Sequence, residues 1–207
     1  MHVPAQRWSN FPPVVTAVMA LCIGMFLIQS MNPRPVIEAL ALWPLGEYFE
    51  PWQLVTYGFL HGSFFHIFIN LFVLWMFGVR IENLWGSGRF ALYFFVCVIG
   101  AGLVQLVVAT LAAAEGTIYP TVGASGGVFG VLLAFGVMFP NERIMLLIPP
   151  IPLKAKWFVV IIGAISLLAG LAGDIGNIAH FAHLGGMVFG LLVLLWWGWR
   201  PGRYWVG

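Results

Sequence analysis

The sequence contains a serine whose surroundings suit nucleophilic catalysis. Ser125 lies between Gly123 and Gly126 in a glycine-rich run at the expected start of a helix. A serine hydroxyl becomes a good nucleophile when an adjacent base takes its proton. His183 opens the last apolar segment, where burial should keep it neutral at pH 7 and able to accept that proton. The free N–H groups of a helix N-terminus would then stabilise a tetrahedral oxyanion.

A second polar group lies at the start of the second apolar segment and comprises His61, His66 and Asn70. His66 and Asn70 are four residues apart, so they share one face of a helix. Their side chains could donate hydrogen bonds to the same oxyanion. They could equally be an interhelical hydrogen-bond pair, and at this point both interpretations stand.

Glycines accompany the serine and the histidine at helical spacing. Gly126 and Gly130 form one i,i+4 pair, and Gly186 and Gly190 form another. Small residues at this spacing let two helices approach closely, and a serine among them is often a packing residue itself. The same close approach would bring a base within hydrogen-bond distance of Ser125. The glycines therefore fit either packing alone or packing together with catalysis.

The histidines also permit a metal site. His180 and His183 could join His61 and His66, because imidazole suits zinc, copper, iron and nickel. We expect no metal, because no carboxylate or thiolate lies at the same level and such a site leaves Ser125 unexplained. A proton-coupled transporter is a weaker hypothesis still, because we expect no acidic residue within any span.

The composition restricts the class of protein that could carry these groups. Of the 207 residues, 61% are hydrophobic and 8% are charged, far from the values of soluble domains. The 18 Phe and 10 Trp exclude a disordered chain, and a net charge of +2 gives no reason to expect a nucleic-acid partner. Both cysteines, Cys22 and Cys97, lie in apolar runs, which excludes a disulfide scaffold. An integral membrane protein remains.

The spacing of charged residues predicts an all-α bundle of six transmembrane helices in one domain over residues 1–207. Each charge-free window is long enough for one helix of about 20 residues. We place the helices near 13–31, 64–83, 90–112, 124–140, 156–173 and 177–198. The first could be mistaken for a signal peptide, but it is long enough to span. We expect no soluble appendage.

The basic residues predict the orientation. Eight of the nine fall on one side of a six-span chain: Arg7, Arg80, Arg89, Arg143, Lys154, Lys156, Arg200 and Arg203. Arg34 falls on the other side, with five of the seven acids: Glu38, Glu47, Glu50, Glu115 and Asp174. Cytoplasmic loops carry the excess of Lys and Arg, so both termini should be cytoplasmic.

The polar groups should share one depth in the outer half of the bilayer. Helix rise places Ser125, Asn70 and His183 each roughly 9 Å below the outer surface of a hydrocarbon core about 30 Å thick. Residues 116–123 must then descend as irregular chain, which predicts a hydrated pocket open to the outside. The aromatic, proline-rich segment 32–63 should lie in the outer interface.

With these residues the chain resembles the rhomboid intramembrane serine proteases of the bacterial, six-helix type. Three motifs match in order. The first is His61, His66 and Asn70 in the H-x₄-H-x₃-N pattern, and the second is Gly123 to Gly126 for G-x-S-G. The third is Ala182-His183-Leu184-Gly185-Gly186 with Gly190 for A-H-x-x-G-x-x-x-G. Each motif is short, but the three occur in this order, and the resemblance as a whole covers about 13–200.

The resemblance implies a catalytic dyad of Ser125 and His183. It implies an oxyanion hole formed by His66, Asn70 and the backbone amide of Ser125, with Phe129 packed against His183. The implied supporting residues are His61, Gly123, Gly126, Phe129, Gly186 and Gly190. Segment 32–63 corresponds to the family's membrane-embedded first loop, and the turn from Glu82 to Arg89 also looks like the family's.

Two positions depart from the pattern: Gln53 stands where many members have arginine, and Phe129 where many have tyrosine. The arginine supports loop structure in the family, so neither change bears on the dyad. The expected protein is an endopeptidase of the bacterial inner membrane, without metal or cofactor, whose partners are the bilayer and transmembrane protein substrates. A non-enzymatic scaffold or chaperone of the same fold, binding transmembrane helices, is the alternative.

Overall fold

The computed structural model describes residues 8–145, 150–172 and 179–199 of the chain. These residues form helices and one short hairpin. The elements are α1 (Pro13–Met31), α2 (Pro33–Leu40), α3 (Gln53–Thr56), η1 (Tyr57–Phe59), α4 (Phe64–Val73), η2 (Leu74–Gly78), α5 (Val79–Trp85), α6 (Ser87–Ala114), α7 (Ser125–Met138), β1 (Arg143–Met145), β2 (Pro152–Lys154), α8 (Ala155–Leu171) and α9 (His180–Trp196). The mainly helical fold expected from the composition is confirmed.

A long helix lies in each of the six expected ranges. Three of them are long and apolar enough to cross a membrane: α1, the continuous helix Phe64–Trp85 made of α4, η2 and α5, and α6. The apolar helices α7, α8 and α9 are shorter. Several predictions fall outside the described residues: those on Arg7, Asp174, Arg200 and Arg203 and on positions 173, 177 and 178.

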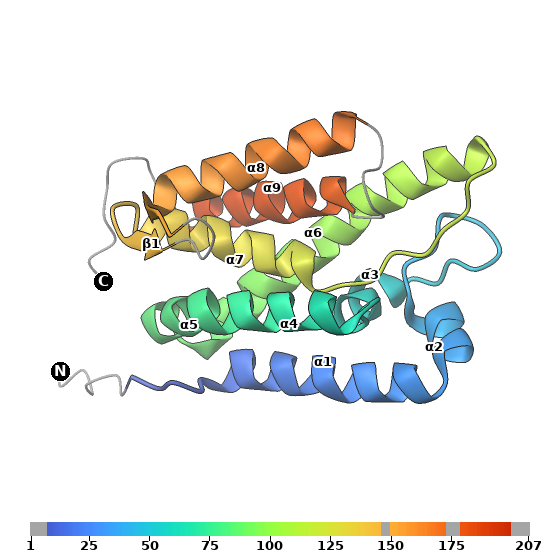
Figure 1. Cartoon of the computed structure of the whole chain (residues 1–207), viewed down its shortest axis with the longest axis horizontal. Helices are drawn as coiled ribbons and strands as arrows, with labels where there is room; N and C mark the ends of the chain where they lie inside the picture. The colour runs from blue at the N-terminus through green and yellow to red at the C-terminus, as the bar shows by residue number, and fades with distance from the viewer. Residues whose placement is uncertain (1–7, 146–149, 173–178, 200–207) are drawn as a thin grey trace.

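The helices α6, α7 and α9 pack against one another at the centre of the bundle, and α6 crosses the others obliquely (Figure 1). The helix α8 packs on α9 and α7, and α1 lies along α4 on the opposite side (Figure 1). Large apolar side chains are exposed on the outer faces of α1 and α8, as expected of helices that contact lipid. The central α7 is mostly buried.

The helix α5 and the hairpin lie at one end of the bundle, and α2 lies at the other (Figure 1). The end with α5 and the hairpin carries Arg80, Arg143 and Lys154, with Arg143 paired to Lys154 across β1 and β2. Arg34 lies at the other end on α2, in an i,i+4 ion pair with Glu38 at 2.8 Å. The described charges therefore divide between the two ends as the sequence predicted.

Glu82 corrects one expectation. It was predicted that no acidic residue lies within a span, yet Glu82 lies in the helix Phe64–Trp85 and is 1% exposed. Its carboxylate accepts hydrogen bonds from Val14 N (2.9 Å) and Val15 N (2.8 Å), and from the Ser87 hydroxyl (2.6 Å). Those amides belong to the first turn of α1, which has no cap of its own. Glu82 therefore caps the N-terminus of α1.

The segment between α1 and α4, expected as a loop in the interface, is partly helical. Proline at its first position starts α2, and α3 and η1 follow nearer to α4. Gln53 is fully buried and holds the turn before it. Its side chain accepts a hydrogen bond from Trp43 N (3.3 Å) and donates one to Tyr48 O (2.9 Å). Gln53 thus supports the loop, at the position where arginine was expected to do so in the resembling family.

Candidate active site

Ser125 is the first residue of α7, and its conformation depends on the residues before it. Ala124 caps the helix, and Gly123 has φ of +132°, a conformation that residues with a side chain rarely adopt. The Gly123 amide donates to Tyr57 O at 2.9 Å, and this bond holds the irregular chain before α7 in place. The N–H groups in the first turn of α7 have no intrahelical partner. They are available to an oxyanion next to Ser125.

His183 lies in the first turn of α9, and its Nε2 is 2.9 Å from Ser125 Oγ. Phe129, one turn below the serine on α7, stacks on the imidazole with ring centroids 4.1 Å apart and planes 11° apart. Both Ser125 and His183 are half-buried, so the pair keeps some access to its surroundings. A neutral His183 oriented in this way can take the serine proton.

Glycines bring the helices that carry the dyad together. A Cβ at Gly186 on α9 would overlap the carbonyl oxygen of Gly126 on α7. A Cβ at Gly190 would overlap the Tyr93 hydroxyl on α6, which donates to Gly130 O at 2.8 Å. The separation of α7 and α9 is therefore set by residues without side chains. The same glycines therefore allow both the close packing of α7 and α9 and the short distance between Ser125 and His183.

His66 on α4 points toward Gly123, in the irregular chain that leads into α7. Its Nδ1 accepts a hydrogen bond from Gly62 N at 3.4 Å, so a neutral ring carries its proton on Nε2. A Cβ placed on Gly123 would lie 2.9 Å from that Nε2 and 3.7 Å from Ser125 Oγ. The donor edge of His66 therefore faces the backbone just before the serine.

Asn70 is 4% exposed and lies one turn after His66 on α4. Its Nδ2 donates to the backbone oxygen of His66 at 2.9 Å. A side-chain amide has two N–H donors, so one remains for another acceptor. The local hydrogen bond fixes the amide along the helix face it shares with His66.

Two further histidines surround these groups. His61 is fully buried, and its ring contacts His66 edge to face at 5.1 Å. His180 lies 6.1 Å from His183 between ring centroids. In the part of the chain that the structure describes, no three His, Cys, Asp or Glu side chains are placed to hold a metal ion. The alternative of a four-histidine metal site therefore has no matching cluster among these described residues.

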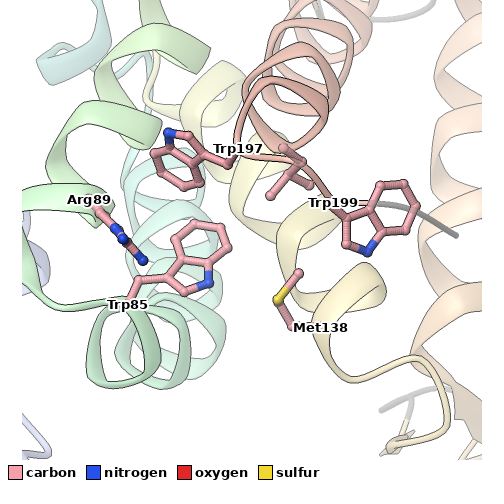
Figure 2. A pocket seen from close by; sticks show the side chains of 6 residues that line it. Trp85, Arg89, Met138, Trp197 and Trp199 are labelled. Atoms are coloured by element: carbon pink, nitrogen blue, oxygen red, sulfur yellow. The ribbon is translucent and has the colours of Figure 1, made fainter. Parts of the chain in front are cut away.

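A pocket lies at the opposite end of the bundle from Ser125 and is lined by Trp85, Arg89, Met138, Leu194, Trp197 and Trp199. Figure 2 shows the indole rings of Trp85, Trp197 and Trp199 around it, with Arg89 on one side. The residues come from the ends of α5, α7 and α9 and the start of α6. None of them was predicted as a site residue.

One polar residue near the site was not singled out in the sequence. Gln29 on α1 is 8% exposed and forms two hydrogen bonds with the backbone of His61. Its signal was available, because it is an uncharged polar side chain in an otherwise apolar span. The sequence could not show its partner, which lies 32 positions away.

Comparison with known proteins identifies the family. The family model described as the rhomboid domain matches residues 48–200. The mitochondrial rhomboid protein 1 of Saccharomyces cerevisiae is 32% identical over 194 residues, which is 92% of this chain and 56% of the yeast protein.

Bacterial relatives match over shorter stretches. The rhomboid protease GlpG of Klebsiella pneumoniae is 32% identical over 99 residues, 46% of this chain and 36% of that protein. GlpG of Yersinia pestis is 26% identical over 133 residues, 59% of this chain and 48% of that protein. The chain thus spans about half the length of the yeast relative and matches smaller shares of the bacterial ones.

Proposed function

This chain belongs to the rhomboid family, and we propose that it is a serine endopeptidase that cleaves transmembrane segments of other membrane proteins. The observation that carries the proposal is the 2.9 Å distance between His183 Nε2 and Ser125 Oγ at the N-terminus of α7. Nucleophile and base are within the range in which proton transfer operates. The GlpG relatives are named proteases, which supports the same reaction class.

The chemistry follows from the groups at the site. Ser125 Oγ attacks the scissile carbonyl carbon while its proton passes to His183 Nε2, and the carbonyl oxygen becomes an oxyanion. The C–N bond then breaks, and His183 returns the proton to the leaving amine. A water molecule then attacks the acyl carbon and gives its proton to His183. The ester bond to Ser125 Oγ breaks, and His183 returns that proton to Oγ, which restores the free enzyme. No metal or organic cofactor takes part in this scheme.

The oxyanion would be stabilised by three donors. The backbone N–H of Ser125 lacks an intrahelical partner, His66 presents Nε2–H, and Asn70 retains one side-chain N–H. These groups are held in place before the substrate arrives: His66 by the Gly62 amide and Asn70 by the backbone oxygen of His66. Donors fixed in advance need no reorganisation when negative charge develops.

We further infer that all six long helices cross the bilayer, with the site in its outer half and both chain ends in the cytoplasm. The short helix α7 starts below the outer surface, where a substrate helix could meet Ser125. A helical substrate hides its backbone in internal hydrogen bonds and must unwind before attack. Gly, Ser or Pro near the scissile bond would lower that cost, because these residues favour a helix less than alanine does. We propose a bacterial inner membrane as the compartment: the GlpG relatives come from bacteria, whereas the yeast relative is named as mitochondrial.

Labelling with a fluorophosphonate tests the proposal directly, because only an activated serine reacts. We expect labelling and cleavage of a single-span substrate by the wild type, and neither by Ser125→Ala or His183→Ala. The double variant should be no worse than either single one, because the pair acts as a unit. Substantial cleavage by Ser125→Ala would end the serine-protease hypothesis. A chain that binds transmembrane helices without labelling would be a scaffold instead.

A further inference from the structure

A buried hydrogen-bonded clamp connects α1 to the polypeptide just before α4. The Gln29 side chain donates from Nε2 to His61 O at 2.9 Å and accepts at Oε1 from His61 N at 3.2 Å. The donor and the acceptor of the Gln29 side-chain amide thus both bind the backbone of one residue, His61. Gln29 is 8% exposed and His61 is fully buried, so water cannot easily replace these bonds. The clamp fixes where the backbone of His61 lies.

The next residue along this backbone touches the site. The Gly62 amide donates to His66 Nδ1 at 3.4 Å, and this bond selects the neutral tautomer with its proton on Nε2. That Nε2 edge faces Gly123 and the start of α7. If the peptide between His61 and Gly62 shifted, the ring would lose the acceptor role of Nδ1. The opposite tautomer carries its proton on Nδ1, so its Nε2 cannot donate a hydrogen bond to an oxyanion.

The side chain of His61 adds a second contact at the same place. Its ring packs edge to face on His66, with centroids 5.1 Å apart and planes 68° apart. The backbone that Gln29 holds therefore also carries the ring that lies behind His66. The amide of Gly62 and the ring of His61 together restrict the orientation of His66.

From these contacts we propose that Gln29 is a positioning residue of the oxyanion hole, acting on His66 through the backbone of His61 and Gly62. The inference rests on the proposed protease function. Gln29 itself contacts neither Ser125 nor His183. Its effect should therefore fall on the stabilisation of the transition state and leave ground-state binding of the substrate unchanged.

The test measures the kinetics of several variants on a single-span substrate. Gln29→Met keeps the length of the side chain but removes both hydrogen bonds. It should lower kcat about tenfold with KM unchanged, since a misplacement of about 1 Å in a catalytic group can cost about 10²-fold. Gln29→Glu keeps the acceptor for His61 N and, in its neutral form, a donor for His61 O, so it should show a smaller loss of kcat.

A double variant separates positioning from general destabilisation. On a His66→Ala background, Gln29→Met should cause no further loss of kcat, because the group it positions is gone. Val18→Ala is the matched control: it lies on α1, is 2% exposed, and is 11 residues or about 16 Å along the helix from Gln29. It should lower the melting temperature without lowering kcat.

Three outcomes overturn the inference: full kcat in Gln29→Met, multiplicative losses in the double variant, or an equal loss of kcat in Val18→Ala. Each of these would leave the proposed function intact, provided that the wild type cleaves and Ser125→Ala does not. If the wild type neither cleaves nor labels, the proposed function fails first, and the positioning role fails with it.

Discussion

Replacing Gly123 by alanine should displace His66 while leaving the dyad residues themselves unchanged. A Cβ at Gly123 would lie 2.8 Å from His66 Cε1 and 2.9 Å from its Nε2, whereas ordinary van der Waals contact begins at 3.4 Å. The ring must therefore retreat by roughly 0.6 Å (3.4 less 2.8). Since a displacement of about 1 Å can cost about 10²-fold, we expect kcat to fall about tenfold.

The same substitution also strains the backbone, so a control must separate the two effects. Gly123 has φ of +132°, and a residue with a side chain in such a conformation costs about 1–3 kcal/mol. Gly116 has φ of +91° in the same connection, and a Cβ there meets no described atom within 4 Å. Gly116→Ala should therefore lose comparable stability and keep its kcat.

The assay measures kcat, KM and thermal unfolding of both variants in one detergent, with a single-span substrate. The expected pattern is a lowered melting temperature in both and a lowered kcat in Gly123→Ala alone. If Gly123→Ala keeps full kcat, the edge of His66 that faces Gly123 does not take part in catalysis. If Gly116→Ala loses kcat equally, the effect is backbone strain and says nothing about His66.

Three shorter predictions concern other groups. Asn70→Ala should lower kcat on the order of tenfold by loss of an oxyanion donor, whereas unchanged kcat with lower thermal stability would make Asn70 an interhelical packing residue. Activity should survive strong chelators, and elemental analysis should find no stoichiometric zinc; loss of activity restored by one metal would favour the histidine site. Glu82→Gln should destabilise the protein by about 1–3 kcal/mol in unfolding experiments, because a buried amide of α1 loses its acceptor, with kcat of the folded enzyme unchanged.

The family and the positions of the long helices could be predicted from the sequence because their signals are local. Apolar runs between charges specify where helices form, and they do so without knowledge of partners. The rhomboid resemblance, based on motifs around Asn70, Ser125 and His183, is confirmed by the family comparison. The roles assigned to these residues stay predictions, although Ser125 and His183 lie within hydrogen-bond distance.

Features that depend on distant partners were not predictable. The two hydrogen bonds of Gln29 join residues 32 positions apart, and apolar periodicity carries no information on such pairs. The π-helical turn η2 (Leu74–Gly78) and the hairpin of β1 and β2 are set by tertiary packing, which overrides local preference. The helix α2 could have been predicted more easily from the sequence, since proline at its start and the Arg34–Glu38 spacing both favour a helix.

In the membrane arrangement proposed above, the length of α7 determines how deep the serine lies. Ser125–Met138 is 14 residues, or about 21 Å of helix, against a hydrocarbon core about 30 Å thick. The shortfall of about 9 Å must be made up at one end. Glu142 and Arg143 follow closely after the last turn, and their charges hold that end at the surface. The missing length therefore lies at the Ser125 end, where irregular chain replaces helix.

Irregular backbone at that depth needs hydrogen-bond partners, because lipid supplies none. They come from the segment between α1 and α4. Leu42 N donates to Thr121 O at 3.0 Å, Thr121 N donates to Leu42 O at 2.8 Å, and Gly123 N donates to Tyr57 O at 2.9 Å. A short α7 alone would leave these polar groups unpaired at about 1–3 kcal/mol each. In the membrane arrangement proposed above, the segment between α1 and α4 therefore supplies the hydrogen bonds that allow α7 to begin below the outer surface, and with it the depth of Ser125.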